Sequence, residues 1–74
     1  MSEGPTVHEL FAALERLERL ERRERFVSDR LEVISERVAA FPNEVSLRAQ
    51  AEFAAEHAEL RKQIASLRER LNVA

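Results

Sequence analysis

Residues 38–46 decide the fold, and they read VAAFPNEVS. Pro42 is the only glycine or proline after residue 5, so it separates two long segments that contain no residue of either type. Proline disfavours helical geometry at the preceding residue, here Phe41, and Asn43 can cap a helix that follows. We therefore expect one sharp turn over residues 41–43, with a helix on each side of it.

The two helices can be bounded from their flanking residues. Thr6 and Glu9 have the spacing of a capping box, which marks the start of a helix. We expect the first helix over residues 7–40 and the second over about 44–72, and so short a connection makes them antiparallel neighbours. The N-terminal residues 1–5 are expected to be a disordered lead to a hairpin domain of residues 6–74.

Composition excludes several classes of protein. The 74 residues suffice for one domain, and the absence of cysteine removes disulfides and thiolate metal sites. A net charge of -2 is not that of a general nucleic-acid binder. The N-terminus lacks the basic and apolar regions of a secretion signal, and no apolar run is long enough to cross a membrane. We expect a cytoplasmic protein that does not contact membranes.

Apolar residues in both segments recur at alternating steps of three and four, the heptad spacing of helices that pack along a seam. Glu24 and His57 are polar members of this pattern, and pairing the helices about the turn makes them oppose each other. Their contact would fix the register of the helices or, alternatively, form a proton-linked switch. The expected hairpin seam consists of Leu10, Leu17, Leu20, Val27, Leu31, Ile34, Val38, Phe53, Leu60, Ile64, Leu67 and Leu71.

Other apolar residues lie beside the seam, and one pair of helices cannot bury them all. This surplus predicts an all-α fold in which a two-helix antiparallel coiled-coil hairpin dimerises into a four-helix bundle. In plan, though in no sequence motif, the arrangement resembles the Rop-type hairpin dimers. The expected oligomer or partner interface consists of Phe11, Leu14, Phe26, Val33, Ala51, Ala54, Ala58 and Ala65.

Charged residues dominate the middle of the first helix. Glu15–Arg19, Glu18–Arg22 and Glu21–Arg25 have the favourable i,i+4 order, and each pair can add about 0.2–0.5 kcal/mol to helix stability. A stripe of arginines at heptad spacing also flanks the seam, where it can pair with glutamates of the second helix. The alternative is a contact with an anionic partner such as RNA, against which the interleaved glutamates argue. The stripe consists of Arg16, Arg23, Arg30 and Arg37.

No set of residues indicates catalysis or metal binding. His8-Glu9 begins like the zinc motif His-Glu-x-x-His, but Ala12 occupies the position of the second histidine. We therefore expect no metal, no cofactor and no enzymatic activity. The sequence favours a non-enzymatic protein–protein interaction module that binds itself as a homodimer and binds another protein, as a scaffold, adaptor or small chaperone. The alternative is an RNA-binding regulator that uses the arginine stripe.

Overall fold

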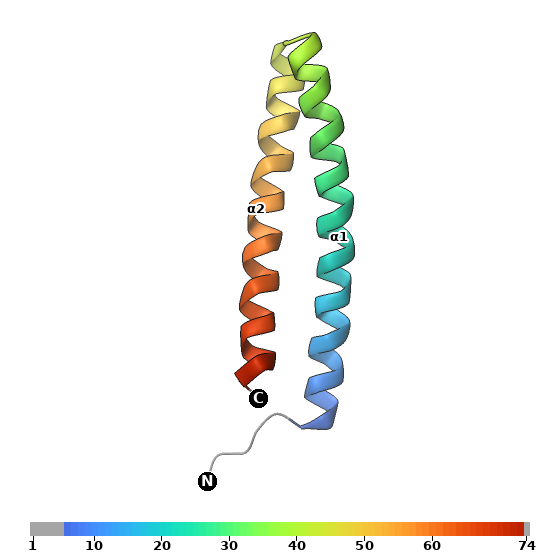
Figure 1. The fold of residues 1–74 in the computed structure, drawn as a ribbon, viewed down its shortest axis with the longest axis vertical. Coiled ribbons are helices and arrows are strands. Elements are labelled where there is room, and N and C mark those ends of the chain that lie inside the picture. The colour runs from blue at the N-terminus through green and yellow to red at the C-terminus, as the bar shows by residue number, and fades with distance from the viewer. Residues whose placement is uncertain (1–5, 74) are drawn as a thin grey trace.

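The computed structural model describes residues 6–73, which form two helices joined by a short turn (Figure 1). Helix α1 spans Val7–Ala40 and helix α2 spans Glu44–Val73. The helices lie side by side and run in opposite directions, and no strand occurs among the residues described. The predicted all-α helical hairpin is thereby confirmed. The predicted lead over residues 1–5 lies outside the described residues.

The start of α1 is the capping box that the sequence predicts. The Glu9 backbone N–H donates to the Thr6 hydroxyl oxygen at 3.1 Å, and the Thr6 backbone N–H donates to the Glu9 carboxylate at 2.9 Å. These bonds satisfy backbone donors that have no partner inside the helix. The bond from the Thr6 backbone, and secondarily the Thr6 side chain, lower the pKa of the Glu9 carboxyl.

The turn ends one helix and starts the next within three residues. The Phe41 backbone N–H donates to the Arg37 carbonyl at 2.7 Å, which closes the last turn of α1. Asn43 then caps α2, because its side-chain oxygen accepts the Ser46 backbone N–H at 2.9 Å. The Asn43 side-chain amide also donates to the Phe41 carbonyl at 3.3 Å, so one side chain joins both helix ends.

The core is a single stripe between the helices. Val27 is 0% exposed, and Leu60, Ile64 and Leu67 are also buried. Every other residue of the expected seam is half-buried. Phe41 continues the same spacing in the sequence, yet it is 74% exposed because the helix ends at Ala40 and the chain turns away there.

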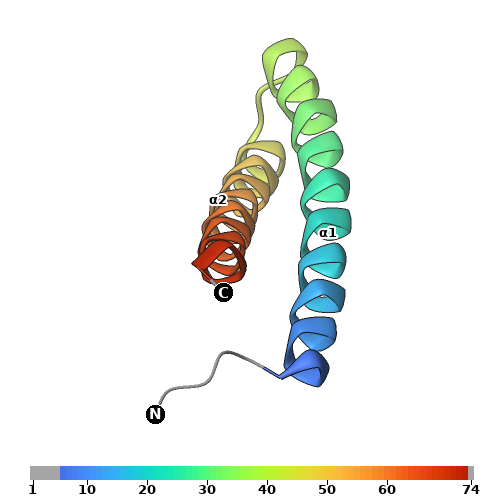
Figure 2. The same ribbon diagram turned by 60° about the horizontal axis from the view of Figure 1, so that its bottom comes forward.

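The hairpin is long and thin, with extents of 59 × 17 × 15 Å. A view turned by 60° likewise shows only the two helices and no further element over them (Figure 2). A single layer of this kind leaves both long sides of the seam partly accessible to solvent. Those two sides carry most of the exposed apolar side chains.

Candidate interaction surfaces

A polar pair interrupts the apolar seam near its middle. His57 Nε2 lies 2.7 Å from a Glu24 carboxylate oxygen, and the two side chains are only 19% and 25% exposed. The structure thus brings together the two residues that the heptad pattern opposes. A second interhelical hydrogen bond lies nearer the turn, where the Gln50 amide donates to the Ser35 hydroxyl at 3.0 Å. Together, the two contacts show which residues of α1 and α2 lie side by side. A polar pair in a seam of this kind favours one register over its alternatives.

Ion pairs join α1 and α2 on both sides of the seam. Arg23 donates to a Glu56 carboxylate oxygen at 2.7 Å, and this hydrogen bond raises the pKa of Arg23. Arg68 of α2 pairs with Glu21 of α1. The Arg23–Glu56 contact lies on one side of the seam, and the Arg68–Glu21 contact lies on the other.

The predicted pairs along α1 form only in part. Arg22 donates to Glu18 at 2.6 Å, as the i,i+4 spacing predicts. Glu21 instead binds Arg68 across the hairpin, and no Glu21–Arg25 or Glu15–Arg19 ion pair is found within the described residues. An interhelical partner can compete with a local one because both are exposed and each pair contributes little.

One long side of the hairpin, here called the arginine flank, carries the arginine stripe. The guanidinium groups of Arg23 and Arg30 lie over the ring of Phe26, at 5.3 and 5.2 Å from its centre. A groove beside them, floored by Ile34 and Phe53, is also lined by Phe26, Arg30, Val33 and Arg37. Phe26 is 46% exposed, so its aromatic ring lies at the surface. Cation–π contacts with Arg23 and Arg30 stabilise its position there.

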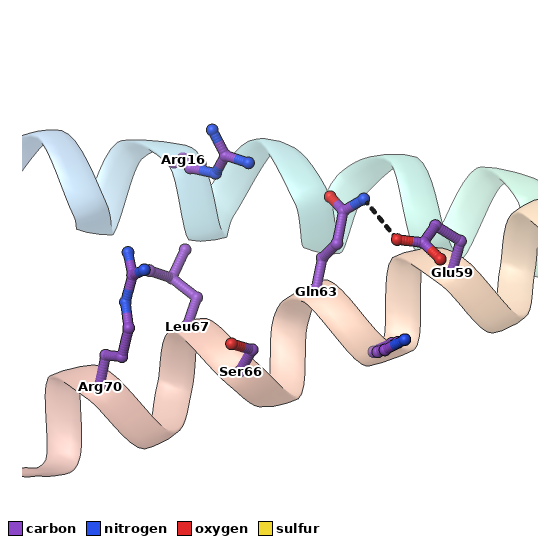
Figure 3. Close-up of a pocket in the computed structure, with 7 residues that line it drawn as sticks. Arg16, Glu59, Gln63, Ser66, Leu67 and Arg70 are labelled. Atoms are coloured by element: carbon purple, nitrogen blue, oxygen red, sulfur yellow. Dashed lines mark hydrogen bonds between the residues drawn. The ribbon is translucent and has the colours of Figure 1, made fainter.

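A second groove lies further along the arginine flank, towards the chain termini. Arg16 lies there on α1, and Arg70 and Gln63 reach from α2 towards that helix (Figure 3). The Gln63 amide donates to Glu59 at 3.1 Å. Within residues 6–73, Arg16, Arg30 and Arg37 have no carboxylate close enough for an ion pair, whereas Arg23 is neutralised by Glu56.

The opposite side, here called the alanine flank, contains a hollow lined by Glu21, Arg25, Arg61, Ala65 and Arg68 over the seam residues Glu24 and Ile64. Residues seven or fourteen positions apart lie on the same face of a helix in a coiled coil. Leu14 therefore shares the face of Glu21, and Phe11 shares that of Arg25. By the same spacing, Ala51, Ala54 and Ala58 belong to this flank with Ala65 and Arg68.

The residues expected to form one interface therefore lie on two flanks. Phe26 and Val33 line a groove on the arginine flank, whereas Phe11, Leu14 and the four alanines belong to the alanine flank. All eight are exposed in the hairpin. A single contact with one flat partner surface cannot cover both groups.

Among the apolar residues near the turn, the heptad spacing assigns Phe41 to the seam, whereas Val45 and Leu47 were assigned to no surface. Phe41, Val45 and Leu47 are all exposed there. Leu47 precedes Ala54 by seven residues, so it extends the alanine flank to the turn. The same spacing rule applied to α2 would have identified it.

Two further features of residues 6–73 bear on the kind of site. They contain no cluster of three histidine or acidic side chains that could hold a metal ion. Neither helix has a stretch apolar and long enough to span a bilayer.

No family model matches the chain, and the searches of curated proteins and of solved structures found no match either.

Proposed function

We propose that this protein is a non-enzymatic interaction module, a helical hairpin that associates with a second copy of itself and presents the assembled surface to another protein. One observation carries the proposal: large apolar side chains that are exposed outnumber the hydrophobic side chains that are buried. The buried hydrophobic residues of the described chain are Val27, Leu60, Ile64 and Leu67. Those exposed to between 46% and 79% are Val7, Phe11, Leu14, Phe26, Val33, Phe41, Val45 and Leu47.

Free energy argues for covering this surface. Burial of apolar area contributes about 25 cal/mol per Å², and small chains without disulfides or metals rarely bury enough of it alone. The hairpin has no cysteine, and its seam is mostly half-buried. A second hairpin would complete the burial of the seam and convert one layer into a four-helix bundle.

The two-sided distribution of apolar residues supports the second part of the proposal. A second copy that covers one flank leaves the other flank free for a different protein. An adaptor, a scaffold or a small chaperone needs such a remaining surface. Arg23 and Arg30, which lie over the exposed Phe26, belong to a residue type that is enriched among those that contribute most to binding energy.

The mass of the protein in solution tests the proposal. Sedimentation equilibrium over a wide range of concentrations should give twice the monomer mass of 8.5 kDa. Helix content and mass should fall together on dilution, because the isolated hairpin has a marginal core. A species that remains folded and monomeric at every concentration would contradict self-association.

Binding of RNA through the arginine flank is a second candidate. It is favoured by the absence of carboxylate partners for Arg16, Arg30 and Arg37 among the described residues. Fluorescence anisotropy with a labelled single-stranded RNA at low salt would test it. Binding should weaken steeply with salt and be lost in the triple alanine variant of these arginines. No binding at low salt would exclude this candidate.

A further inference from the structure

We infer that the second copy packs on the alanine flank, with α1 of each hairpin against α2 of its partner. This inference rests on the proposed self-association and specifies the surface and the arrangement. Both flanks carry exposed apolar residues, so the choice between them needs a separate argument. That argument comes from the residues beside the seam and from the charges on each helix.

Close approach is easier on the alanine flank. Three charged residues, Glu21, Arg61 and Arg68, lie directly beside the seam there, and Glu21 pairs with Arg68. The other residues at these positions include Leu14, Ser28, Ser35, Leu47 and Ala54. They are apolar or small, which gives the wide apolar stripe of a bundle helix. On the arginine flank, the corresponding positions of α1 carry Arg16, Arg23, Arg30 and Arg37. A bundle built on that side would have to desolvate these guanidinium groups, which is costly unless each finds a partner.

The charges on the alanine flank select how the copies align. The α1 side carries Glu18, Glu21 and Glu32 around a single Arg25, whereas the charged residues of the α2 side are Arg61 and Arg68. Placing α1 on α1 of the partner would bring acidic edges together. Placing α1 on α2 of the partner brings an acidic edge to a basic one, which favours this alignment.

This alignment has a two-fold axis along the hairpin. Each helix is then antiparallel to both of its neighbours, as in an up-down-up-down bundle. The axis also keeps every residue at the same level in both copies. The Glu24–His57 and Ser35–Gln50 hydrogen bonds place Ser28 level with Ala54 inside one hairpin. Ser28 of one copy should consequently lie beside Ala54 of the second copy.

Cysteine cross-linking tests the arrangement, because the chain has no cysteine of its own. Ser28→Cys and Ala54→Cys are made in separate chains, mixed, allowed to exchange and oxidised. Each chain then has one thiol, so every disulfide joins two copies. The matched control is a mixture of Val33→Cys and Glu52→Cys, which samples the arginine flank at a similar level. Circular dichroism checks that each variant keeps its helices.

We expect the Ser28/Ala54 mixture to give a mixed disulfide as the main product, and each of these variants alone to give little. Cross-linking of the Val33/Glu52 control instead, with the mass still that of a dimer, would overturn the choice of flank while leaving self-association intact. A dimer that cross-links in neither mixture would also overturn the arrangement. A monomeric mass would overturn both this inference and the proposed function.

Discussion

Glu24 and His57 form a polar layer whose contribution is to alignment more than to stability. Their side chains are largely removed from water and bind each other at 2.7 Å. Replacing a buried polar pair by apolar residues of similar size is often neutral or stabilising, whereas removing one partner leaves the other without a hydrogen bond. We therefore expect the pair to restrict the register at some cost in free energy.

The double variant Glu24→Leu/His57→Leu should accordingly be more stable than the natural chain, by about 1–2 kcal/mol in the free energy of unfolding. The single variant Glu24→Leu should be less stable than the double variant, because it leaves His57 unpaired in the seam. Chemical denaturation followed by circular dichroism measures both. A double variant less stable than the natural chain would show that the pair contributes net stability.

The capping box at Thr6 gives a prediction with a defined pH dependence. Thr6→Ala should lower the free energy of unfolding by about 1 kcal/mol, and Thr6→Ser should retain most of it. The folded-state pKa of Glu9 is lowered, so its contribution is present above the pKa of the unfolded chain and is lost as pH falls through the folded value. Amide hydrogen exchange in the first turn of α1 should show this fraying in acid. Protection factors should separate the two bonds, because Thr6→Ala removes the acceptor of the Glu9 amide whereas acid weakens the acceptor of the Thr6 amide.

Within the hairpin, α2 contributes most of the buried seam. Leu60, Ile64 and Leu67 are all buried, whereas Val27 is the only buried residue of α1. Towards the turn, the α2 side of the seam becomes polar, with Ser46 buried and Gln50 bonded to Ser35. The strongest packing is thus between the second half of α2 and the first half of α1.

Ile64→Asp should unfold the hairpin, because it replaces a buried apolar side chain of the seam by a carboxylate. Lys62→Asp is the matched control, since it adds the same side chain to the same helix at an exposed position. Circular dichroism should show loss of helix in the first variant and native helix content in the second. Native helix content in Ile64→Asp would mean that the helices form without this seam.

The sequence predicts the helices well for simple physical reasons. Long segments without glycine or proline, one X-Pro breaker and a capping box define both ends of α1, and Asn43 caps α2 as expected. The heptad pattern also predicts that Glu24 opposes His57. The ion pair of Glu21 with Arg68 was not predicted, because spacing along one helix identifies local partners and leaves interhelical ones undetermined.

At the scale of the whole molecule, the main gain from the structure is the separation of two flanks. Sequence spacing identifies which residues lie beside the seam. Phe26 and Phe11, both members of the expected oligomer or partner interface, lie on opposite sides of that seam. The charged residues also differ, because one side carries the arginine stripe whereas the other carries both acidic and basic side chains, among them Glu21, Arg61 and Arg68. An elongated hairpin with two unlike sides can associate with itself and still bind a different partner.

Two neighbouring alanines test this division with matched variants. Ala54 lies on the alanine flank, whereas Ala55 is turned by about 100° around the same helix, away from the seam. Both are exposed in the hairpin, so Ala54→Arg and Ala55→Arg change the helix propensity and the net charge equally. If the second copy packs on the alanine flank, Ala54→Arg should weaken dimerisation by about tenfold or more, since a long side chain would be forced between closely packed helices and overpacking costs about 1–3 kcal/mol. Ala55→Arg should leave the dimerisation constant within about twofold, because surface substitutions usually change free energy by less than about 0.5 kcal/mol. Sedimentation equilibrium measures both constants, and equal effects of the two substitutions would place the dimer contact elsewhere.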